Sequence, residues 1–149
     1  MLVAKDGGIL TSAGYGLANI EKNIPNTAKT KFRIGTITEQ FTAMAIMMLQ
    51  EAEKLNVQDK ICKYITDCPA AWQEITIHHL LTHSSGLNDS FTEKTLGPTM
   101  KKQPQTPGEF ISKIRDLPLD FNPGERWAED VSTGDFSNDV NYILLGYII

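Results

Sequence analysis

The sequence has no long hydrophobic run. No apolar stretch approaches the roughly 18 residues that a membrane-spanning helix requires. Met1 leads directly into LVAK, without the charged, apolar and small-residue segments of a signal peptide. Basic residues are few, with 14 Lys and Arg against 18 Asp and Glu, and they are interspersed with the acids. We therefore expect a soluble chain without a membrane span, and we do not expect nucleic acid as a partner.

Cysteine is scarce as well. The two cysteines, Cys62 and Cys68, lie around an expected helix end. Their spacing permits a local disulfide and equally suits two free buried thiols. The chain has 149 residues, 41% hydrophobic and 21% charged, which is the composition of an ordinary globular protein. A domain of this length buries about 70% of its unfolded surface, so a sizeable core is expected.

The start of the chain predicts a β-hairpin. Residues 2–5 and 9–15 are expected to form strands, joined at Asp6, Gly7 and Gly8. Asp-Gly supplies the positive φ that tight hairpin turns require. Because two strands alone are not stable, we expect the hairpin to pack on the helix that follows.

That helix is expected to begin near Thr36. Its apolar residues recur at the spacing of one buried helical face. The face comprises Phe41, Met44, Ala45, Met48, Leu49, Ala52 and Leu55, and Ile46 and Met47 add a second apolar side. The first half is thus apolar nearly all round, which predicts a central helix packed on two sides.

Two later segments carry helix start signals. Residues 59–87 are expected to hold two short helices separated by Pro69, with Thr76 capping the second and Gly86 following its end. Residues 106–109, Thr-Pro-Gly-Glu, are typical of a capping box with Pro in the first turn. The buried face of that helix is expected at Phe110, Ile111, Ile114 and Leu117.

His79 and His83 stand four residues apart on one helical face, the spacing of a two-histidine metal site. His79 is not followed by the Glu of the His-Glu-x-x-His motif, and no third ligand is evident in the sequence. We therefore expect core or capping roles for both rings, and neither a metal nor a cofactor.

Three stretches occur in an order that a known family shares. They are FRIGTITEQFTAMA at 32–45, ITIHHLLTHSSGL at 75–87, and FNPGERW at 121–127 followed by NYILLGYII. This series resembles the serine β-lactamase and penicillin-binding-protein family, in its branch of class C-like esterases and D-alanyl-D-alanine carboxypeptidases. The resemblance covers the N-terminal half of such proteins.

The resemblance implies an α+β fold. Residues 1–149 would form a single partial β-lactamase-related domain, with the hairpin and its connection over 1–31 and a mostly helical region over 32–149. The C-terminal strands of the family fold would be lacking. A last helix is expected at VNYILLGY, residues 140–147. Ser132, Thr133 and Gly134 superficially match a motif of those strands, but they precede this helix, and we expect a turn at these three residues.

The resemblance places Thr36 and Glu39 in two catalytic positions. In the family, Ser-x-x-Lys supplies an acylated Ser and a Lys that exchanges its proton. Thr36 keeps a hydroxyl, but its methyl group crowds the attack path. A carboxylate with a reference pKa of about 4.3 is a weak base towards an alcohol unless burial raises that pKa. Thr-x-x-Glu is also a capping box, and we favour that interpretation.

A further family motif, Tyr-x-Asn, follows Pro-Gly-Glu-Arg-Trp closely in relatives. Here eight residues intervene, and the two positions hold Phe136 and Asn138, or Ser137 and Asp139 in a second register. Phe136 fills the volume of Tyr but cannot relay a proton. Asn138 could orient an amide or ester, and we favour a role in capping the following helix.

These substitutions predict a β-lactamase-related domain without catalytic activity. The alternative is a weak ester or β-lactam hydrolase that uses Thr36 as nucleophile. An unpaired hairpin edge and an apolar C-terminus also predict self-association as a dimer.

Overall fold

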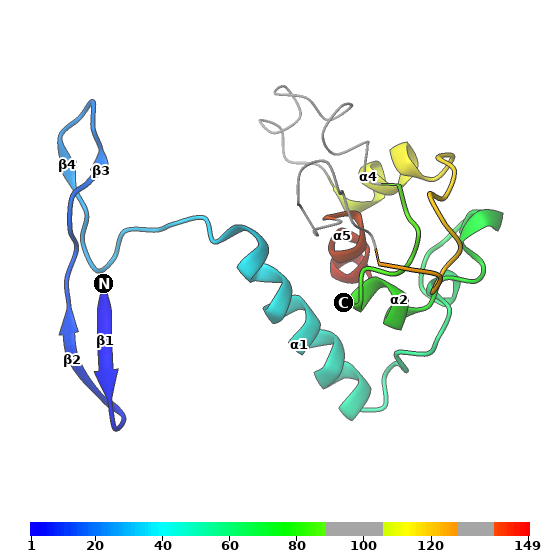
Figure 1. Ribbon diagram of the computed structural model, residues 1–149, viewed down its shortest axis with the longest axis horizontal. Helices are drawn as coiled ribbons and strands as arrows, with labels where there is room; N and C mark the ends of the chain where they lie inside the picture. The colour runs from blue at the N-terminus through cyan, green and yellow to red at the C-terminus, as the bar shows by residue number, and fades with distance from the viewer. Residues whose placement is uncertain (89–105, 128–138) are drawn as a thin grey trace. The chain divides into compact units, whose positions relative to one another are not determined.

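A computed structural model describes residues 1–88, 106–127 and 139–149 of the chain. These residues divide into two compact units, Met1–Gly35 and Thr36–Ile149 (Figure 1). The first unit contains small antiparallel sheets and the second is helical, so the α+β class is confirmed. The packing of the hairpin on the helical region and the single domain both stay predictions.

The first unit begins with the predicted hairpin. Strands β1 (Leu2–Lys5) and β2 (Gly8–Ser12) pair antiparallel, with one shift of register inside β1. The turn residues Asp6 and Gly7 have φ values of 50° and 77°. Both values are positive, as the predicted tight turn requires. Strand β2 ends at Ser12, whereas the sequence predicted a strand over residues 9–15.

A second hairpin follows that the sequence did not predict. Strands β3 (Leu17–Asn19) and β4 (Ile24–Pro25) pair antiparallel. The loop between them turns at Asn23, whose φ is 49°, and asparagine tolerates this left-handed conformation better than most residues. The backbone N–H of Asn26 donates to the Gly16 carbonyl at 2.9 Å and closes the hairpin.

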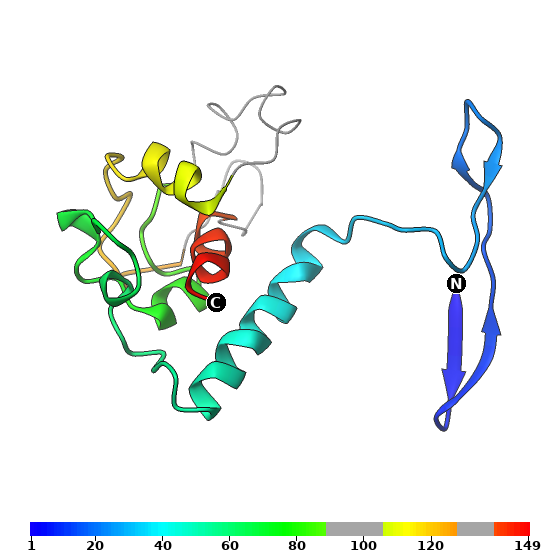
Figure 2. The ribbon, with the colours of Figure 1, turned by 180° about the vertical axis from the view of Figure 1, so that it is seen from behind.

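The second unit is built from short helices and turns around α5. The elements are η1 (Gly35–Ile37), which spans the unit boundary, α1 (Thr38–Glu51), η2 (Ile61–Lys63), η3 (Ala70–Trp72), α2 (Ile77–Leu81), α4 (Pro107–Ile114) and α5 (Asp139–Ile148). Helix α5 contacts α1, α2 and α4 (Figures 1 and 2). None of the described helices combines the length and the apolar character that crossing a membrane requires.

The core of this unit is apolar and continuous. Trp72, Leu80 and Leu144 are fully buried, and they come from η3, α2 and α5. The rest of the core is Ile46, Leu55, Ile61, Ile65, Ile75, Ile77, Leu87, Phe110, Ile111, Ile114, Val140 and Leu145. One hydrophobic cluster is thus shared by three parts of the chain that are far apart in sequence, residues 46–87, 110–114 and 140–145.

The described helical unit packs against one side of α1, and the expectation that a second side is packed stays a prediction. Ile46 is the buried residue of α1, whereas Phe41, Met44 and Met48 are 62%, 61% and 61% exposed. Among the described residues of the unit, α5 packs against α1. Apolar periodicity shows which residues share a face, but it does not show what packs against that face.

Two of the predicted helix caps are confirmed. At the start of α2, the Thr76 hydroxyl accepts from the His79 N–H at 3.1 Å, and His79 Nδ1 accepts from the Thr76 N–H at 3.3 Å. At the start of α4, Thr106 and Glu109 form the same reciprocal pair. Each cap satisfies backbone donors that a helix start leaves without an intrahelical partner. His79 therefore has the expected capping role.

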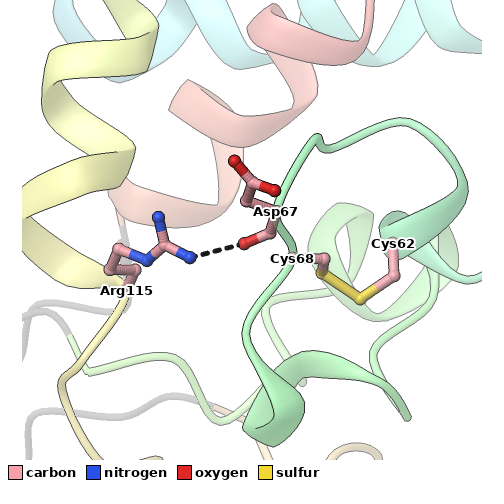
Figure 3. Close-up of a disulfide and its surroundings, with 4 residues drawn as sticks. All are labelled: Cys62, Asp67, Cys68 and Arg115. Atoms are coloured by element: carbon pink, nitrogen blue, oxygen red, sulfur yellow. Dashed lines mark hydrogen bonds between the residues drawn. A yellow bond between two sulfur atoms is a disulfide. The ribbon is translucent and has the colours of Figure 1, made fainter.

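Residues 59–87 differ from the prediction of two short helices separated by Pro69. They contain η2 before Pro69, and both η3 and α2 after it. Cys62 and Cys68 form a disulfide across this segment, with their Cα atoms 5.2 Å apart (Figure 3). Next to the bridge, Arg115 Nη2 donates to the Asp67 carbonyl at 2.6 Å. The bridged loop is thereby tied to the end of α4.

We expect the double substitution Cys62→Ala with Cys68→Ala to lower the free energy of unfolding by about 2 kcal/mol. The bridge closes a short loop, and its removal restores conformational freedom to the unfolded chain. Urea denaturation of the oxidised proteins measures the loss. The wild-type protein in dithiothreitol should match the double variant, and the variant should be insensitive to the reductant. Equal stability of oxidised and reduced wild type would contradict the expectation.

Candidate functional site

Of the four candidate catalytic residues, the structure describes two. Thr36 is exposed and lies in η1, and Glu39 is half-buried in the first turn of α1. Phe136 and Asn138, together with the expected turn at Ser132–Gly134, lie outside the described residues. In the second register, Ser137 is also outside them, and Asp139 is the first residue of α5.

The predicted capping box of Thr36 and Glu39 is wrong. Helix α1 begins at Thr38, its N-cap is Ile37, and the described residues provide this end with no side-chain cap. An N-cap residue needs extended backbone so that its side chain can reach the following N–H groups. Thr76 and Thr106 have that backbone, with ψ values of 164° and 149°. Thr36 lies inside a 3-10 turn instead.

Glu39 is directed towards His83. Its Oε2 lies 3.4 Å from His83 Nε2, and the two side chains are only 18% and 20% exposed. A carboxylate accepts a hydrogen bond from the N–H of a neutral imidazole and forms an ion pair with a protonated ring. Partial burial strengthens either interaction relative to one in open solvent. The pair therefore connects the first turn of α1 to the segment after α2.

The other ring nitrogen of His83 also has a polar contact. His83 Nδ1 lies 3.4 Å from Asn141 Nδ2, and Asn141 Oδ1 accepts from the Ser85 hydroxyl at 2.6 Å. The Leu87 N–H donates to the same hydroxyl oxygen at 3.1 Å. One proton arrangement suits all these contacts: Asn141 donates to Nδ1, and the proton of a neutral His83 is on Nε2, facing Glu39. We call Glu39, His83, Asn141 and Ser85 the polar network.

The backbone of His83 is unusual. Its φ is 52°, a left-handed conformation that non-glycine residues adopt rarely. Helix α2 ends at Leu81 with Thr82 as C-cap, so the turn comes earlier than the predicted stop at Gly86. Side-chain contacts on both ring nitrogens hold His83 in place. Such outliers persist where surrounding contacts over-determine them.

Tyr142 lies beside the polar network. Its ring centroid is 5.1 Å from that of His83, and its hydroxyl donates to the Leu81 carbonyl at 3.3 Å. Burial raises the pKa of Tyr142, and the charge of Glu39 raises it further. The phenol therefore stays protonated at neutral pH. In this state it is a hydrogen-bond donor and cannot act as a general base.

The contacts of the polar network indicate that it holds its side chains in position and does not transfer a proton. Ser85 and Asn141 are fully buried and hydrogen-bonded to one another, which is the usual condition of buried polar groups. In the described parts of the chain, no group of three or more His, Cys, Asp or Glu residues is placed to hold a metal ion. Sequence reasoning missed Ser85, Asn141 and Tyr142. The available signal was Asn141, a polar residue within the otherwise apolar run of α5.

Comparison with known proteins places the chain in context. The family model described as Beta-lactamase matches residues 1–149. The protein PbpX of Bacillus subtilis is described as a candidate penicillin-binding protein. It is 32% identical to this chain over 148 residues, which are 99% of this chain and 33% of that protein. The chain thus spans about one third of the length of this curated relative.

Two solved structures are similar in both sequence and fold. A penicillin-binding protein from Bacillus halodurans is 34% identical with a TM-score of 0.74, over 89% of this chain and 38% of that one. An octameric penicillin-binding-protein homologue from Pyrococcus abyssi is 34% identical with a TM-score of 0.74, over 99% of this chain and 33% of that one. The described fold therefore matches part of these larger folds.

We expect a double-mutant cycle to couple Glu39 to His83 by about 1 kcal/mol, because both side chains are mostly shielded from water. The variants are Glu39→Gln, His83→Asn and both together, and asparagine is chosen because it tolerates a left-handed backbone. Urea denaturation at neutral pH measures each stability. The same cycle on the exposed pair Lys60 and Glu74 provides a control, for which we expect a smaller coupling. Additive effects at Glu39 and His83 would show that the contact is not formed.

Proposed function

The chain belongs to the β-lactamase family, and we propose that the part of the family fold it carries is catalytically silent. The observation that supports this proposal is the contact of Glu39 with His83 at 3.4 Å. Glu39 occupies the position where the resemblance expects the proton-accepting Lys. Its carboxylate is engaged in the polar network, which links three elements of the helical unit.

The charge at position 39 matters for acyl transfer. A buried Lys can be tuned to act as a neutral amine that takes a proton from the adjacent hydroxyl. Glu39 brings a negative charge to the same place, and taking a proton from Thr36 would disturb its contact with His83. A nucleophile without a suitably placed base stays a weakly reactive alcohol. We therefore infer that Glu39 has a structural role in place of a catalytic one.

The second candidate function is weak hydrolysis of an ester or β-lactam with Thr36 as nucleophile. The observation that favours it is the exposure of Thr36, which leaves the hydroxyl accessible to a substrate. In this mechanism the Thr36 oxygen would form an acyl bond and the leaving group would depart with the proton. Water would then release the acid and restore the hydroxyl.

We expect no covalent adduct when the chain is incubated with a fluorescent penicillin. We also expect no hydrolysis of nitrocefin or p-nitrophenyl acetate above the rate of the Thr36→Val variant. The physical reason is the absence of a free base at position 39. Intact-mass spectrometry detects the adduct, and initial rates measure turnover. An adduct that forms in the wild type and disappears in Thr36→Val would contradict the proposed lack of catalysis and establish Thr36 as a nucleophile.

We further propose that the chain self-associates, as a dimer through the first hairpin or through the apolar C-terminus. Within the described residues, β1 and β2 form a two-stranded sheet, so each strand has one unpaired edge. Leu2, Ile9 and Leu10 in this hairpin are 63%, 68% and 66% exposed. At the C-terminus, Ile149 is 55% exposed. The similar protein from Pyrococcus abyssi is described as octameric, which is consistent with assembly in this family.

We expect the chain to sediment as a dimer or larger species at micromolar concentration. Exposed apolar strands with an open edge favour pairing with a second copy. If the hairpin is the contact, Leu10→Lys should shift the protein towards monomer. Ile20→Lys is the matched control, because Ile20 is 83% exposed and lies outside β1 and β2. A well-folded monomer over the whole concentration range would contradict the proposal.

A further inference from the structure

A hollow of about 510 Å³ lies in the helical unit beside α2. One wall comes from α2 and the residues after it, and the other from residues 124–127. The Gly124 N–H donates to the Ser84 carbonyl at 2.8 Å, which fixes the two segments side by side. In Figure 1 the segment after α4 returns past α2 in this region. The hollow is within the size range of small-molecule sites, and its lining includes neither Thr36 nor any residue assigned above to catalysis.

His79 presents a fixed hydrogen-bond donor to this hollow. Its Nδ1 accepts the Thr76 N–H, so in the neutral ring the proton is on Nε2. Desolvation lowers the pKa of His79, and the charges of His78 and Lys60 lower it further, which keeps the ring neutral at pH 7. A Cβ atom on Gly124 would lie 3.2 Å from Nε2. Glycine at this position therefore keeps the space in front of the donor open.

The two hydroxyl groups in the wall are already used as donors. Thr82 Oγ1 donates to the His78 carbonyl at 2.9 Å. Its oxygen lies 2.8 Å from Ser84 Oγ, and because Thr82 has a single proton, Ser84 must donate to Thr82. Neither hydroxyl proton is then left to bind a ligand. Charged and ring N–H groups remain as the donors of the hollow.

Arg126 supplies positive charge from the opposite wall. Its guanidinium lies 4.8 Å from the centre of the Phe121 ring, a cation–π contact that restricts its position. The neighbouring Glu125 carboxylate also lines the hollow, and it accepts from the N–H and the side-chain amide of Asn122 at 3.1 Å each. Glu125 is thus committed to its own turn. Trp127 adds an indole ring that is 74% exposed.

We propose that this hollow binds a small organic carboxylate with an apolar or ring-bearing body. Arg126 and His79 Nε2 donate to the carboxylate oxygens, and the indole of Trp127 packs against the body. Guanidinium is the side-chain group best matched to carboxylate geometry. Aromatic rings provide contact area at low conformational cost. This binding requires no catalytic step, so it stands apart from the proposed function.

Benzoate is the probe that tests the site, with benzamide as its neutral, isosteric control. Tryptophan fluorescence reports binding, because Trp127 is exposed whereas Trp72 is fully buried. We expect saturable quenching by benzoate with a Kd of about 1 mM, as suits a ligand of so few atoms. Benzamide should bind at least about tenfold more weakly. Equal binding of the two, or no saturation by benzoate below about 50 mM, would overturn the proposal.

Two substitutions distinguish benzoate binding in the hollow from a general effect of the positive charge of the protein. Arg126→Gln should weaken benzoate binding about tenfold and leave benzamide unchanged. Arg33→Gln removes an equal charge outside the hollow, and it should bind benzoate like the wild type. Circular dichroism checks that each variant is folded.

A second measurement does not depend on the variants. Benzoate should shift the side-chain 15N resonance of His79 Nε2 in the wild-type protein, because that atom donates to the ligand. Unchanged affinity in Arg126→Gln, or a His79 resonance that does not move at saturation, would refute the assignment.

Discussion

The hydrogen bond between Ser85 and Asn141 is the contact on which the helical unit depends. Both residues are fully buried, and the bond joins the segment after α2 to the first turns of α5. Loss of one partner would leave a polar group unsatisfied in an apolar core, which costs more than the bond itself contributes. The bond sets the position of α5 relative to α2. It thereby fixes Asn141 beside His83, and His83 in turn meets Glu39 of α1.

The sequence predicted the features whose partners are close along the chain. The caps at Thr76 and Thr106, the first hairpin turn and the helices at α4 and α5 all follow from residues within a few positions of one another. Thr36 and Glu39 have the residue types and spacing of the same capping box, yet no cap forms because the backbone there is a 3-10 turn. A side-chain motif therefore needs the matching backbone conformation before it acts as a cap.

Contacts between distant segments were not predictable in this way. The residues of the Ser85–Asn141 bond are 56 positions apart, and the pattern of α5 shows only that Asn141 interrupts an apolar run. The periodicity of α1 likewise identifies a face but does not show which segment covers it. The family resemblance supplied the order of the elements and the catalytic positions. It could not show that Glu39 would meet His83, because that contact arises from a substitution.

The left-handed backbone of His83 makes the end of α2 dependent on distant parts of the chain. Few non-glycine residues adopt this conformation, and here the ring has contacts from α1 and from α5, the latter 58 residues away. Helix α2 can start locally from its Thr76 cap. Within the described residues, the side-chain contacts of the ring nitrogens come from α1 and α5, so the geometry at the end of α2 depends on both helices. The C-terminal end of α2 therefore depends on non-local contacts, which form at a cost in chain entropy.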